Sequence, residues 1–399
     1  MQEILKEPIV DTIVVGSGPA GSQCAYNLSS RGHSVILLDY RENIGDKLCT
    51  GIVSAEFEKF YPDVSKFIYR RAYSASIFSP SGKLLKIKRK SPQALIIDRE
   101  SFIREIAFNA EKLDTKLKLG RVVEKIEVNS KFVQVRVKYN GEVEEYTSRS
   151  LVLASWFGSR LAKMVGLDTP KTKIFGAQVK IKFNGIDEVN VFTGHSLPKG
   201  FFGWMVPLNN NYSYLGILGK ENPKEIFEDF CRNLKNRFTT LSFSDDVDIW
   251  GITVSPSSKI FSNRIVGIGD VVGQVKPTTG GGIYFSMRSA DLASQVLSEG
   301  LLSNNLSETF LSNYQKSWEK IFKKELQVGQ LARFFYESLS EDEINNIINY
   351  LFESGVLDKE ISFDWHSELV MYAFKTKILN FVKTPMRKAV QKVIYSLNN

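Results

Sequence analysis

The sequence predicts an α/β protein, in which a Rossmann-like nucleotide-binding domain is interrupted by a mostly antiparallel β-sheet domain and followed by a helical C-terminal region. Three observations carry this prediction: a strand, glycine turn, helix and strand near the start of the chain, a second glycine-rich segment far along it, and short strand-like runs between them. A chain of 399 residues is also long for a single core, which favours two or three domains.

The first glycine-rich unit has the order strand, glycine turn, helix, strand and acid. Residues 12–15 and 34–38 are apolar runs typical of buried strands, and residues 19–31 have the pattern of an amphipathic helix. The turn carries a G-x-G-x-x-G motif made by Gly16, Gly18 and Gly21. These glycines allow a pyrophosphate to approach the N-terminus of the helix, and Asp39 can accept hydrogen bonds from an adenosine ribose. The unit therefore predicts a bound dinucleotide.

The second glycine-rich segment, GIGDVVGQVKPTTGGG at residues 267–282, has six glycines in sixteen residues and one carboxylate, Asp270. A nicotinamide dehydrogenase completes its cofactor site within its first half, whereas a flavin dinucleotide is longer and needs a second contact region. Asp270 can accept hydrogen bonds from ribitol hydroxyls, and the glycines that open the next helix can present N–H groups to the N1 and C2 oxygen edge of the ring. The two segments together predict FAD and a glutathione-reductase-type Rossmann domain.

The remaining chain divides by its hydrophobic pattern. Residues 72–97 alternate like strands, a helix begins near Arg99, and residues 173–253 are strand-like apart from one helix in residues 223–238. The last hundred residues have helical periodicity. The predicted domains are a discontinuous FAD-binding domain (1–65, 91–172 and 255–300), an antiparallel-sheet substrate domain (66–90 and 173–254) and a C-terminal helical region (301–399).

Composition sets limits on the class of protein. With 43% hydrophobic and 24% charged residues the chain is an ordinary globular protein. It has no run of about 18 apolar residues and no signal peptide ahead of the first strand. Its three separated cysteines fit a reducing cytoplasm, offer no C-x-x-C metal pattern and are too few for a four-cysteine iron–sulfur cluster. We therefore expect a cytoplasmic protein without a metal site.

The net charge of +8 is not accompanied by a nucleic-acid motif, so no nucleic-acid partner is predicted. From Val370 onward the chain carries six basic residues and no acidic ones, interleaved with apolar residues. Such a basic amphipathic tail can lie on anionic lipid at the inner membrane surface. A solvated helix packed on the domain would explain the same pattern.

The chain resembles the geranylgeranyl reductase family of FAD-dependent enzymes, within the larger group of p-hydroxybenzoate-hydroxylase-like flavoproteins, over most of its length to about residue 335. The first glycine motif, Gly269, Asp270, Pro277 and the glycines after it are shared by the whole fold group and indicate FAD rather than a particular substrate. Arg99, in DRESF, matches the arginine that these flavoproteins place against the cofactor. The alternative is a helix-start arginine in a surface ion pair.

Two motifs resemble the family more narrowly. FGWMVP, residues 202–207, is similar to its aromatic-x-Trp-x-Phe-Pro signature, with Val206 in place of the usual Phe. Phe202 and Trp204 would share one face of a strand and line an apolar tunnel for a polyprenyl chain, although such a strand can also simply pack in a core. KLCTG, residues 47–51, is similar to the family's cysteine loop near the flavin. There Cys49 could deliver or relay a proton, or pack as a small apolar residue.

The resemblance implies three groups of site residues and no metal ligand. The catalytic candidate is Cys49, and the substrate candidates are Phe202, Trp204 and Pro207. The cofactor-binding candidates are Gly16, Gly18, Pro19, Ala20, Gly21, Asp39, Tyr40, Cys49, Arg99, Val123, Gly269, Asp270, Pro277, Gly280, Gly281, Gly282 and Ile283.

One departure concerns the turn after the strand LVLA. Hydroxylases of the fold group have Ala-Asp-Gly there, whereas this chain has Ser155 and Trp156, which removes an aspartate that those enzymes use beside the cofactors. This weakens the case for an NAD(P)H-driven hydroxylase. Because no second dinucleotide fingerprint is present, the electron donor is left open between reduced ferredoxin and NAD(P)H.

The resemblance implies a reductase that uses FAD to saturate isolated double bonds of geranylgeranyl or polyprenyl chains in archaeal-type membrane lipids. An isolated alkene has no carbonyl to accept hydride density, so hydride from flavin N5 must be accompanied by a proton. One alternative is a flavin-dependent monooxygenase or halogenase, since FGWMVP also loosely resembles a halogenase Trp-x-Trp-x-Ile-Pro motif. Others are an electron-transfer-flavoprotein–quinone oxidoreductase, which needs more cysteines, and a non-catalytic flavin- or lipid-binding protein.

Overall fold

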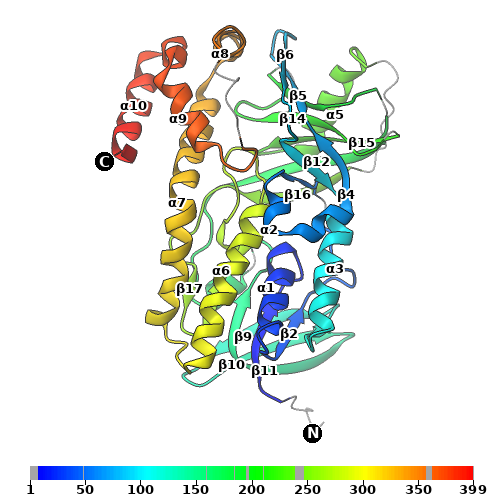
Figure 1. Cartoon of the computed structure of the whole chain (residues 1–399), viewed down its shortest axis with the longest axis vertical. Helices are drawn as coiled ribbons and strands as arrows, with labels where there is room; N and C mark the ends of the chain where they lie inside the picture. Colours follow the sequence, from blue (N-terminus) through cyan, green and yellow to red (C-terminus); the bar gives the residue numbers. More distant parts are fainter. Residues whose placement is uncertain are drawn as a thin grey trace.

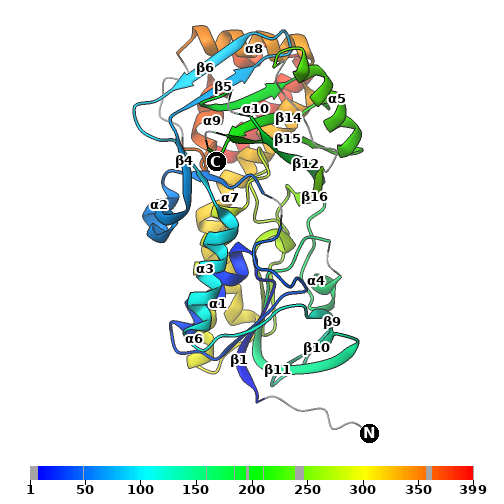
Figure 2. The same cartoon turned by 90° about the vertical axis from the view of Figure 1, so that its right-hand side faces the viewer.

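The protein, described by a computed structural model, has two lobes stacked along its long axis (Figure 1, Figure 2). The lower lobe contains an eight-stranded sheet and the upper lobe a seven-stranded sheet, and a separate three-stranded sheet completes the strands. The described residues are 8–47, 49–158, 160–183, 185–194, 197–209, 211–238, 247–355 and 362–398.

The lower lobe is built around parallel strands. Its strands are β1 (Val10–Val15), β2 (Val35–Leu38), β8 (Lys116–Lys118), β9 (Val122–Val128), β10 (Val133–Tyr139), β11 (Glu142–Leu153), β17 (Phe261–Ser262) and β18 (Ile265–Gly267). The order is β17-β18-β11-β1-β2-β8, and β10 and β9 extend β11 as an antiparallel ribbon. β1 is parallel to both β2 and β11, and β11 is parallel to β18. Both faces of the central strands are buried, which explains their nearly continuous apolar sequences.

Three helices pack together on one face of this sheet: α1 (Pro19–Ser29), α3 (Arg99–Glu111) and α6 (Ile283–Leu302) (Figure 1). The turn from β1 into α1 depends on Gly16, whose φ is +109°. A Cβ on Gly16 would lie 2.4 Å from the carbonyl oxygen of Ala154. The bare backbone therefore lets the N-terminus of α1 sit directly over the ends of β1 and β11.

The upper lobe is a mostly antiparallel sheet. Its strands are β5 (Ser74–Phe78), β6 (Leu84–Lys88), β12 (Lys173–Lys182), β13 (Val189–Thr193), β14 (Phe202–Pro207), β15 (Tyr212–Gly219) and β16 (Asp248–Thr253). Their order is β16-β12-β15-β14-β13-β5-β6, and only the β13–β5 pair is parallel. α5 (Pro223–Lys235) buries Phe227, Phe230 and Leu234 against one face. The other face packs with Ile96 and Val275, so it is turned toward the lower lobe.

Short elements complete the connection between the lobes. β3 (Ile52–Ser54), β7 (Ala94–Ile97) and β4 (Ile68–Ala72) form the three-stranded sheet. β4 lies within the residues that the sequence assigned to the substrate domain, but it pairs with β7 and not with the seven-stranded sheet. Short helices among the described residues also include α2 (Phe57–Phe60), η1 (Pro62–Phe67), α4 (Leu161–Met164) and η2 (Gly269–Val272).

The C-terminal region is helical and touches both lobes. It consists of α7 (Glu308–Ser338), α8 (Glu341–Glu353), α9 (Ser367–Lys375), η4 (Lys377–Phe381) and α10 (Thr384–Asn398). α7 has 31 residues and is therefore about 46 Å long (Figure 1). Its first half packs Trp318 and Phe322 into the lower-lobe core, whereas Leu331 and Phe335 pack with α8 and α9. Among the described residues, no helix is both long and apolar enough to cross a bilayer.

This architecture confirms the predicted fold class, an α/β Rossmann-like domain with an inserted antiparallel sheet and a helical C-terminal region. The predicted helix start at Arg99 is observed, with Asp98 as N-cap accepting a hydrogen bond from the Ser101 N–H.

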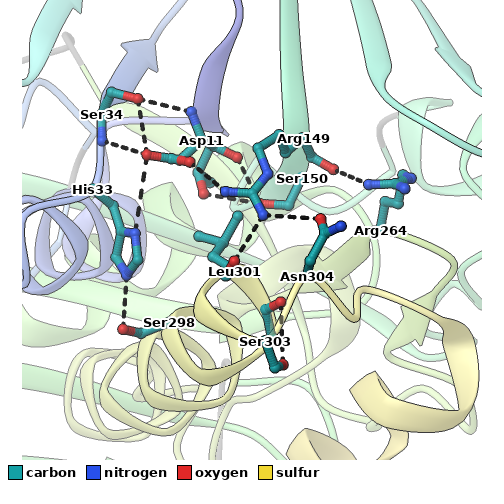
Figure 3. Close-up of polar contacts among 12 residues, drawn as sticks. Asp11, His33, Ser34, Arg149, Ser150, Arg264, Ser298, Leu301, Ser303 and Asn304 are labelled. Atoms are coloured by element: carbon teal, nitrogen blue, oxygen red, sulfur yellow. Dashed lines mark hydrogen bonds and ion pairs between the residues drawn. The ribbon is translucent and has the colours of Figure 1, made fainter.

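A polar network holds the edge of the parallel sheet that lies opposite the carboxyl ends of its strands (Figure 3). Asp11 in β1 accepts hydrogen bonds from the N–H and hydroxyl of Ser34, both at 3.0 Å, and from Arg149 in β11 at 2.9 Å. His33 lies 4.0 Å from Asp11 and shares a 2.7 Å hydrogen bond with Ser298 in α6. Burial alone would raise the pKa of Asp11, but the bonds from Ser34 and Arg149 outweigh it and lower that pKa. An ionised carboxylate therefore joins β1, β11 and the turn before β2.

His33 gives this network a predictable pH dependence. Burial lowers the pKa of His33; Asp11 opposes the shift, while Arg149 and Arg31 reinforce it. The folded protein therefore keeps His33 neutral at pH values where the unfolded chain, with a pKa near 6.5, already binds a proton. The free energy of unfolding should fall as the pH drops from about 7.5 to about 5.5. Thermal unfolding measured at both pH values should show a smaller decrease in Tm for His33→Gln than for the wild type.

Ser298→Ala is the control for this prediction. It removes the hydrogen-bond partner of His33 but keeps the imidazole, so it should lower Tm at both pH values and leave the difference between them unchanged. If His33→Gln loses as much stability between the two pH values as the wild type does, His33 does not contribute in this way.

Candidate active site

A cavity of about 450 Å³ lies where the carboxyl ends of the parallel strands meet the seven-stranded sheet. Its wall is formed by the turns after β1, β2, β11 and β18, by the loop of residues 41–49 and by β16. Ligands of open α/β folds bind at the carboxyl ends of the strands. The cavity is therefore in the place expected for a dinucleotide.

Two helix N-termini converge on this cavity. α1 contributes Gly18, Pro19 and Ala20 to the wall, and α6 contributes Gly282 and Ile283. The N–H groups at a helix N-terminus carry partial positive charge and favour anions. The charged side chains in the wall also favour anions, because five are cations and two are carboxylates. The cations are Arg41, Lys47, Arg99, Arg121 and Arg160, and the carboxylates are Asp39 and Asp270. The cavity therefore suits a long ligand that carries anionic groups.

Asp39 is buried at the end of β2 and is already held on two sides. Its Oδ2 accepts hydrogen bonds from the N–H of Ser17 at 2.6 Å and from the Ser17 hydroxyl at 2.8 Å. Its Oδ1 accepts from the N–H of Arg41 at 2.9 Å. A carboxylate offers about four acceptor positions, so Asp39 is fixed in place and can still accept from a ligand.

Asp270 follows β18 and joins the two glycine-rich halves of the site. Its Oδ2 lies 2.5 Å from Nζ of Lys47, which comes from the loop after the first nucleotide unit. The turn that carries it is fixed by Gln274, which accepts from the Gly269 N–H at 2.7 Å and donates to the Tyr314 hydroxyl of α7 at 2.8 Å. The turn that carries the Asp270 carboxylate is therefore fixed by a hydrogen bond to α7.

Arg99 is buried, so it is not the surface residue that the alternative of a helix-start ion pair requires. One of its guanidinium nitrogens donates to the backbone carbonyls of Gly45, at 2.5 Å, and of Lys47. Its side chain also lines the cavity. Arg99 therefore braces the loop that leads to Cys49 and has a face toward the cavity. Leu48, in that loop, lies outside the described residues.

Cys49 lies in the cavity wall and is partly exposed. Its Sγ accepts a 3.4 Å hydrogen bond from the N–H of Gly51. Tyr214 of β15 interacts electrostatically with Cys49: burial raises the pKa of the Tyr214 hydroxyl, and Cys49 raises it further. The phenol of Tyr214 therefore keeps its proton at neutral pH.

The seven-stranded sheet supplies an aromatic side of the site. Trp250 and Ile252 of β16 line the cavity, and Trp204 of β14 is buried behind them. The ring of Trp204 lies over Gly216, where a Cβ would be 2.4 Å from Trp204 Cζ2. The ring of Trp250 lies over Gly176 in the same way, at 2.5 Å. A glycine on the neighbouring strand gives each indole room to lie against the sheet.

Gln178 links this aromatic side to the loop of Cys49. It is fully buried, and its Oε1 accepts hydrogen bonds from Trp204 Nε1 at 3.1 Å and from the Thr50 hydroxyl at 2.6 Å. An indole N–H can only donate, so the amide oxygen must face Trp204. The amide Nε2 has no hydrogen-bond partner among the described residues. Trp204 is therefore oriented by a polar contact as well as by packing.

The turn after β11 places Ser155 and Trp156 in the cavity wall. Trp156 is 50% exposed and packs edge-on against Phe157, with ring centroids 4.7 Å apart. The Ser155 hydroxyl is buried and has no hydrogen-bond partner among the described residues. An unpaired buried hydroxyl costs roughly 1–3 kcal/mol, so a polar ligand in the cavity would relieve this cost.

The structure brings most of the predicted cofactor-binding residues to this one cavity. Those in its wall are Gly16, Gly18, Pro19, Ala20, Asp39, Tyr40, Cys49, Arg99, Val123, Gly269, Asp270, Gly280, Gly282 and Ile283. The cavity wall does not include the other predicted cofactor-binding residues or the predicted substrate residues, which are Gly21, Pro277, Gly281, Phe202, Trp204 and Pro207.

Several wall residues carried no prediction from the sequence. They include Lys47, Arg121, Arg160, Trp250 and Ile252. Trp250 and Ile252 alternate in the strand DIWGIT, so their shared face could have been read from the period-two pattern. Arg121 and Arg160 lie outside any recognisable motif, and only the folded chain brings them to the site.

Comparison with known proteins agrees with this geometry. Residues 14–86 match the family model of an NAD(P)-binding Rossmann-like domain. A solved geranylgeranyl bacteriochlorophyll reductase-like protein from Thermoplasma acidophilum is similar with a TM-score of 0.84 and 20% identity, covering 96% of this chain and 99% of that one. A flavin-dependent brominase is similar with a TM-score of 0.73 and 15% identity, covering 98% and 100%. The fold is thus shared with flavin-dependent proteins, which supports a flavin cofactor.

Sequence relatives match nearly the whole chain. Digeranylgeranylglycerophospholipid reductase from Methanococcus vannielii is 27% identical over 365 residues, covering 87% of this chain and 92% of that protein. The protein of the same name from Methanocaldococcus jannaschii is 25% identical over 361 residues, covering 87% and 91%. By these matches, its fold and the two glycine-rich segments at one cavity, the chain is similar to the geranylgeranyl reductase family over most of its length.

Proposed function

We propose that this protein is an FAD-dependent reductase that saturates isolated double bonds of geranylgeranyl chains in archaeal-type membrane lipids. The observation that carries the proposal is the cavity, in which two helix N-termini and a cationic wall face an aromatic sheet. Relatives named digeranylgeranylglycerophospholipid reductase support the same activity. A monooxygenase or halogenase has less support, because the likeness to the brominase is one of fold.

The hydrogen-bonding groups of the cavity wall fit FAD. Asp39 would accept from the adenosine ribose, and the N-terminus of α1 would hold the pyrophosphate, where the unpartnered Ser155 hydroxyl supports a polar ligand. Asp270 would accept from the ribitol. The N-terminus of α6 would face the N1 and C2 oxygen edge of the ring. The other proposed contacts are the wall residues Tyr40, Cys49, Arg99 and Val123.

The chain's own residues must hold the alkene, exclude water and supply a proton. Reduced FAD, when bound, supplies the hydride. The indole of Trp250 and the side chain of Ile252 offer an apolar surface for a polyprenyl chain, and Trp204 supports that surface from behind. Each methylene buried there contributes roughly 0.8 kcal/mol. A dry, apolar surface also keeps water from competing for the proton and the hydride.

Cys49 is the proposed proton donor. It is the described cysteine that lies in the cavity wall, since Cys24 and Cys231 are buried elsewhere. Cys49 is partly exposed, so water can return a proton to it after the product has left.

The proposed partners are a polyprenyl lipid, an electron donor and a membrane surface. The proposed electron donor is reduced ferredoxin or NAD(P)H, because the sequence has no second dinucleotide fingerprint that would identify the donor. Helix α10 packs on α7 and exposes Val393 and Tyr395. The exposed basic residues around it are Lys375, Lys377, Lys383, Arg387, Lys388 and Lys392. We propose that this end of the molecule contacts anionic lipid at the cytoplasmic membrane surface.

Asp270→Ala should weaken FAD binding. The ribitol hydroxyls lose an ionised acceptor, which costs about 1.5–3 kcal/mol and raises Kd roughly 10- to 150-fold. Titration of the FAD-free protein with FAD, followed by flavin fluorescence, measures the change. Glu142→Ala, which removes an exposed carboxylate at the start of β11, is the control and should keep the wild-type Kd. A wild-type protein that takes up no FAD would overturn the site assignment altogether.

The reaction itself is tested by the lipid products. Incubation of the protein and chemically reduced FAD with an unsaturated archaeal-type ether lipid should give products that gain two hydrogens per reduced double bond. Mass spectrometry of the lipid extract measures this gain, and a reaction without protein is the control. Oxygenated or halogenated lipid would instead assign the protein to the monooxygenase or halogenase class.

Cys49→Ala should slow reoxidation of the reduced flavin by lipid and leave reduction by dithionite intact, because only the lipid step needs the thiol proton. Cys49→Ser keeps a hydroxyl and should fall between Cys49→Ala and the wild type. Stopped-flow absorbance of the flavin separates the two half-reactions, and Cys231→Ala is the matched control away from the cavity. Wild-type reoxidation rates in both Cys49 variants would mean that the proton comes from another source.

A further inference from the structure

A buried ion pair lies behind the second glycine-rich segment. Lys276 Nζ is 2.7 Å from Asp364 Oδ1, and both side chains are only 3% exposed. The ammonium also donates to the carbonyl of Phe363 at 2.9 Å and lies 4.2 Å from the centre of the Phe363 ring. Neither charged residue is in the cavity wall, so the reaction proposed above does not use the pair directly.

Lys276 packs against the turn that opens α6. Its N–H donates to the Gly281 carbonyl and its carbonyl accepts from the Gly280 N–H, both at 3.0 Å. A Cβ on Gly281 would lie 2.8 Å from Lys276 Cε and 3.4 Å from Nζ. Gly280 and Gly282 of the same turn line the cavity. The ammonium is therefore separated from the cavity by little more than one layer of backbone.

Asp364 connects this turn to the strand that follows the loop of Cys49. Its Oδ2 accepts a 2.9 Å hydrogen bond from the N–H of Ser54 at the end of β3. Helix α7 fixes the next residues, because Glu325 accepts hydrogen bonds from the N–H groups of His366 at 2.7 Å and Ser367 at 2.9 Å. Two segments that flank the cavity therefore converge on one buried carboxylate.

Asp364 is ionised in this pair. Burial alone would raise the pKa of Asp364, but Lys276 and the hydrogen bonds from Lys276 and Ser54 hold that pKa below its usual value. His366, which shares a 2.9 Å hydrogen bond with Thr278, stays neutral because burial and Lys276 lower its pKa to about 4. Burying two charges often costs more free energy than their attraction returns, so such a pair is weak evidence for stability and invites a functional explanation.

We propose that Lys276 and Asp364 are positioning residues that set the reduction potential of the flavin, an inference that rests on the FAD site of the proposed function. Two-electron reduction puts negative charge on the N1 and C2 oxygen edge of the ring, which faces the N-terminus of α6 in that site. A cation behind the turn stabilises the reduced form, and a carboxylate beside the cation limits this effect. Lys276 Nζ lies 3.4 Å from the position of a Cβ on Gly281 in that turn, so we expect the cation to outweigh the carboxylate and the pair as a whole to favour the reduced form.

The test is the midpoint potential of the FAD-loaded protein, measured anaerobically against reference dyes. Lys276→Met should make the potential more negative, and Asp364→Asn should make it more positive. Each shift should correspond to at least a tenfold change in the ratio of reduced to oxidised flavin, or about 30 mV for a two-electron couple. Lys276→Arg should restore the wild-type value. Lys323→Met, which removes an exposed lysine of an ion pair on α7, is the matched control and should change nothing.

Shifts in the same direction, or unchanged potentials in both variants, would overturn the proposal and leave the pair a purely structural role. If either single variant does not fold or bind FAD, the double variant Lys276→Met with Asp364→Leu decides, because removing both charges of a buried pair is better tolerated than removing one. Its potential should lie below the wild-type value, and an unchanged potential would refute the proposal. A wild-type protein that binds no FAD contradicts the proposed function instead, so the two failures are distinguishable.

Discussion

The parallel register of β1, β11 and β18 is the constraint on which the site depends. Val15 of β1 pairs with Leu153 of β11, and Leu153 pairs with Gly267 of β18, so all three strands end at the same edge of the sheet. The turns that follow them carry the two glycine-rich segments and Ser155, and they can only meet because the strands run in one direction. The network of Asp11 and Arg149 at the opposite edge holds β1 and β11 in this register.

The site divides its tasks between the lobes. The helix N-termini and most of the wall cations belong to the lower lobe, whereas Trp250 and Ile252 come from the seven-stranded sheet. The brominase matches 98% of this chain, so proteins with different chemistry share the fold of both lobes and not of the nucleotide-binding lobe alone.

The parts of the site that could be predicted from the sequence are those encoded within a short segment. The Gly16 turn, Asp39 and Asp270 each follow a buried strand whose apolar run is visible in the sequence, so their place at the strand ends follows directly. The bonds of Gln178 to Trp204 and of Asp364 to Lys276 could not be predicted, because each joins segments that meet only in the folded chain. Periodicity shows which residues share a face, but not which faces meet.

Helix α7 connects the two lobes rigidly, because it packs against both of them. Its residues up to Leu326 are packed in the lower core and those from Leu331 onward in the upper cluster, with no break in the helix between them. A hinge between the lobes would have to bend this helix or unpack one of the two clusters, and either change would expose apolar surface. We therefore expect a long, flexible ligand to reach the cavity without a hinge motion between the lobes.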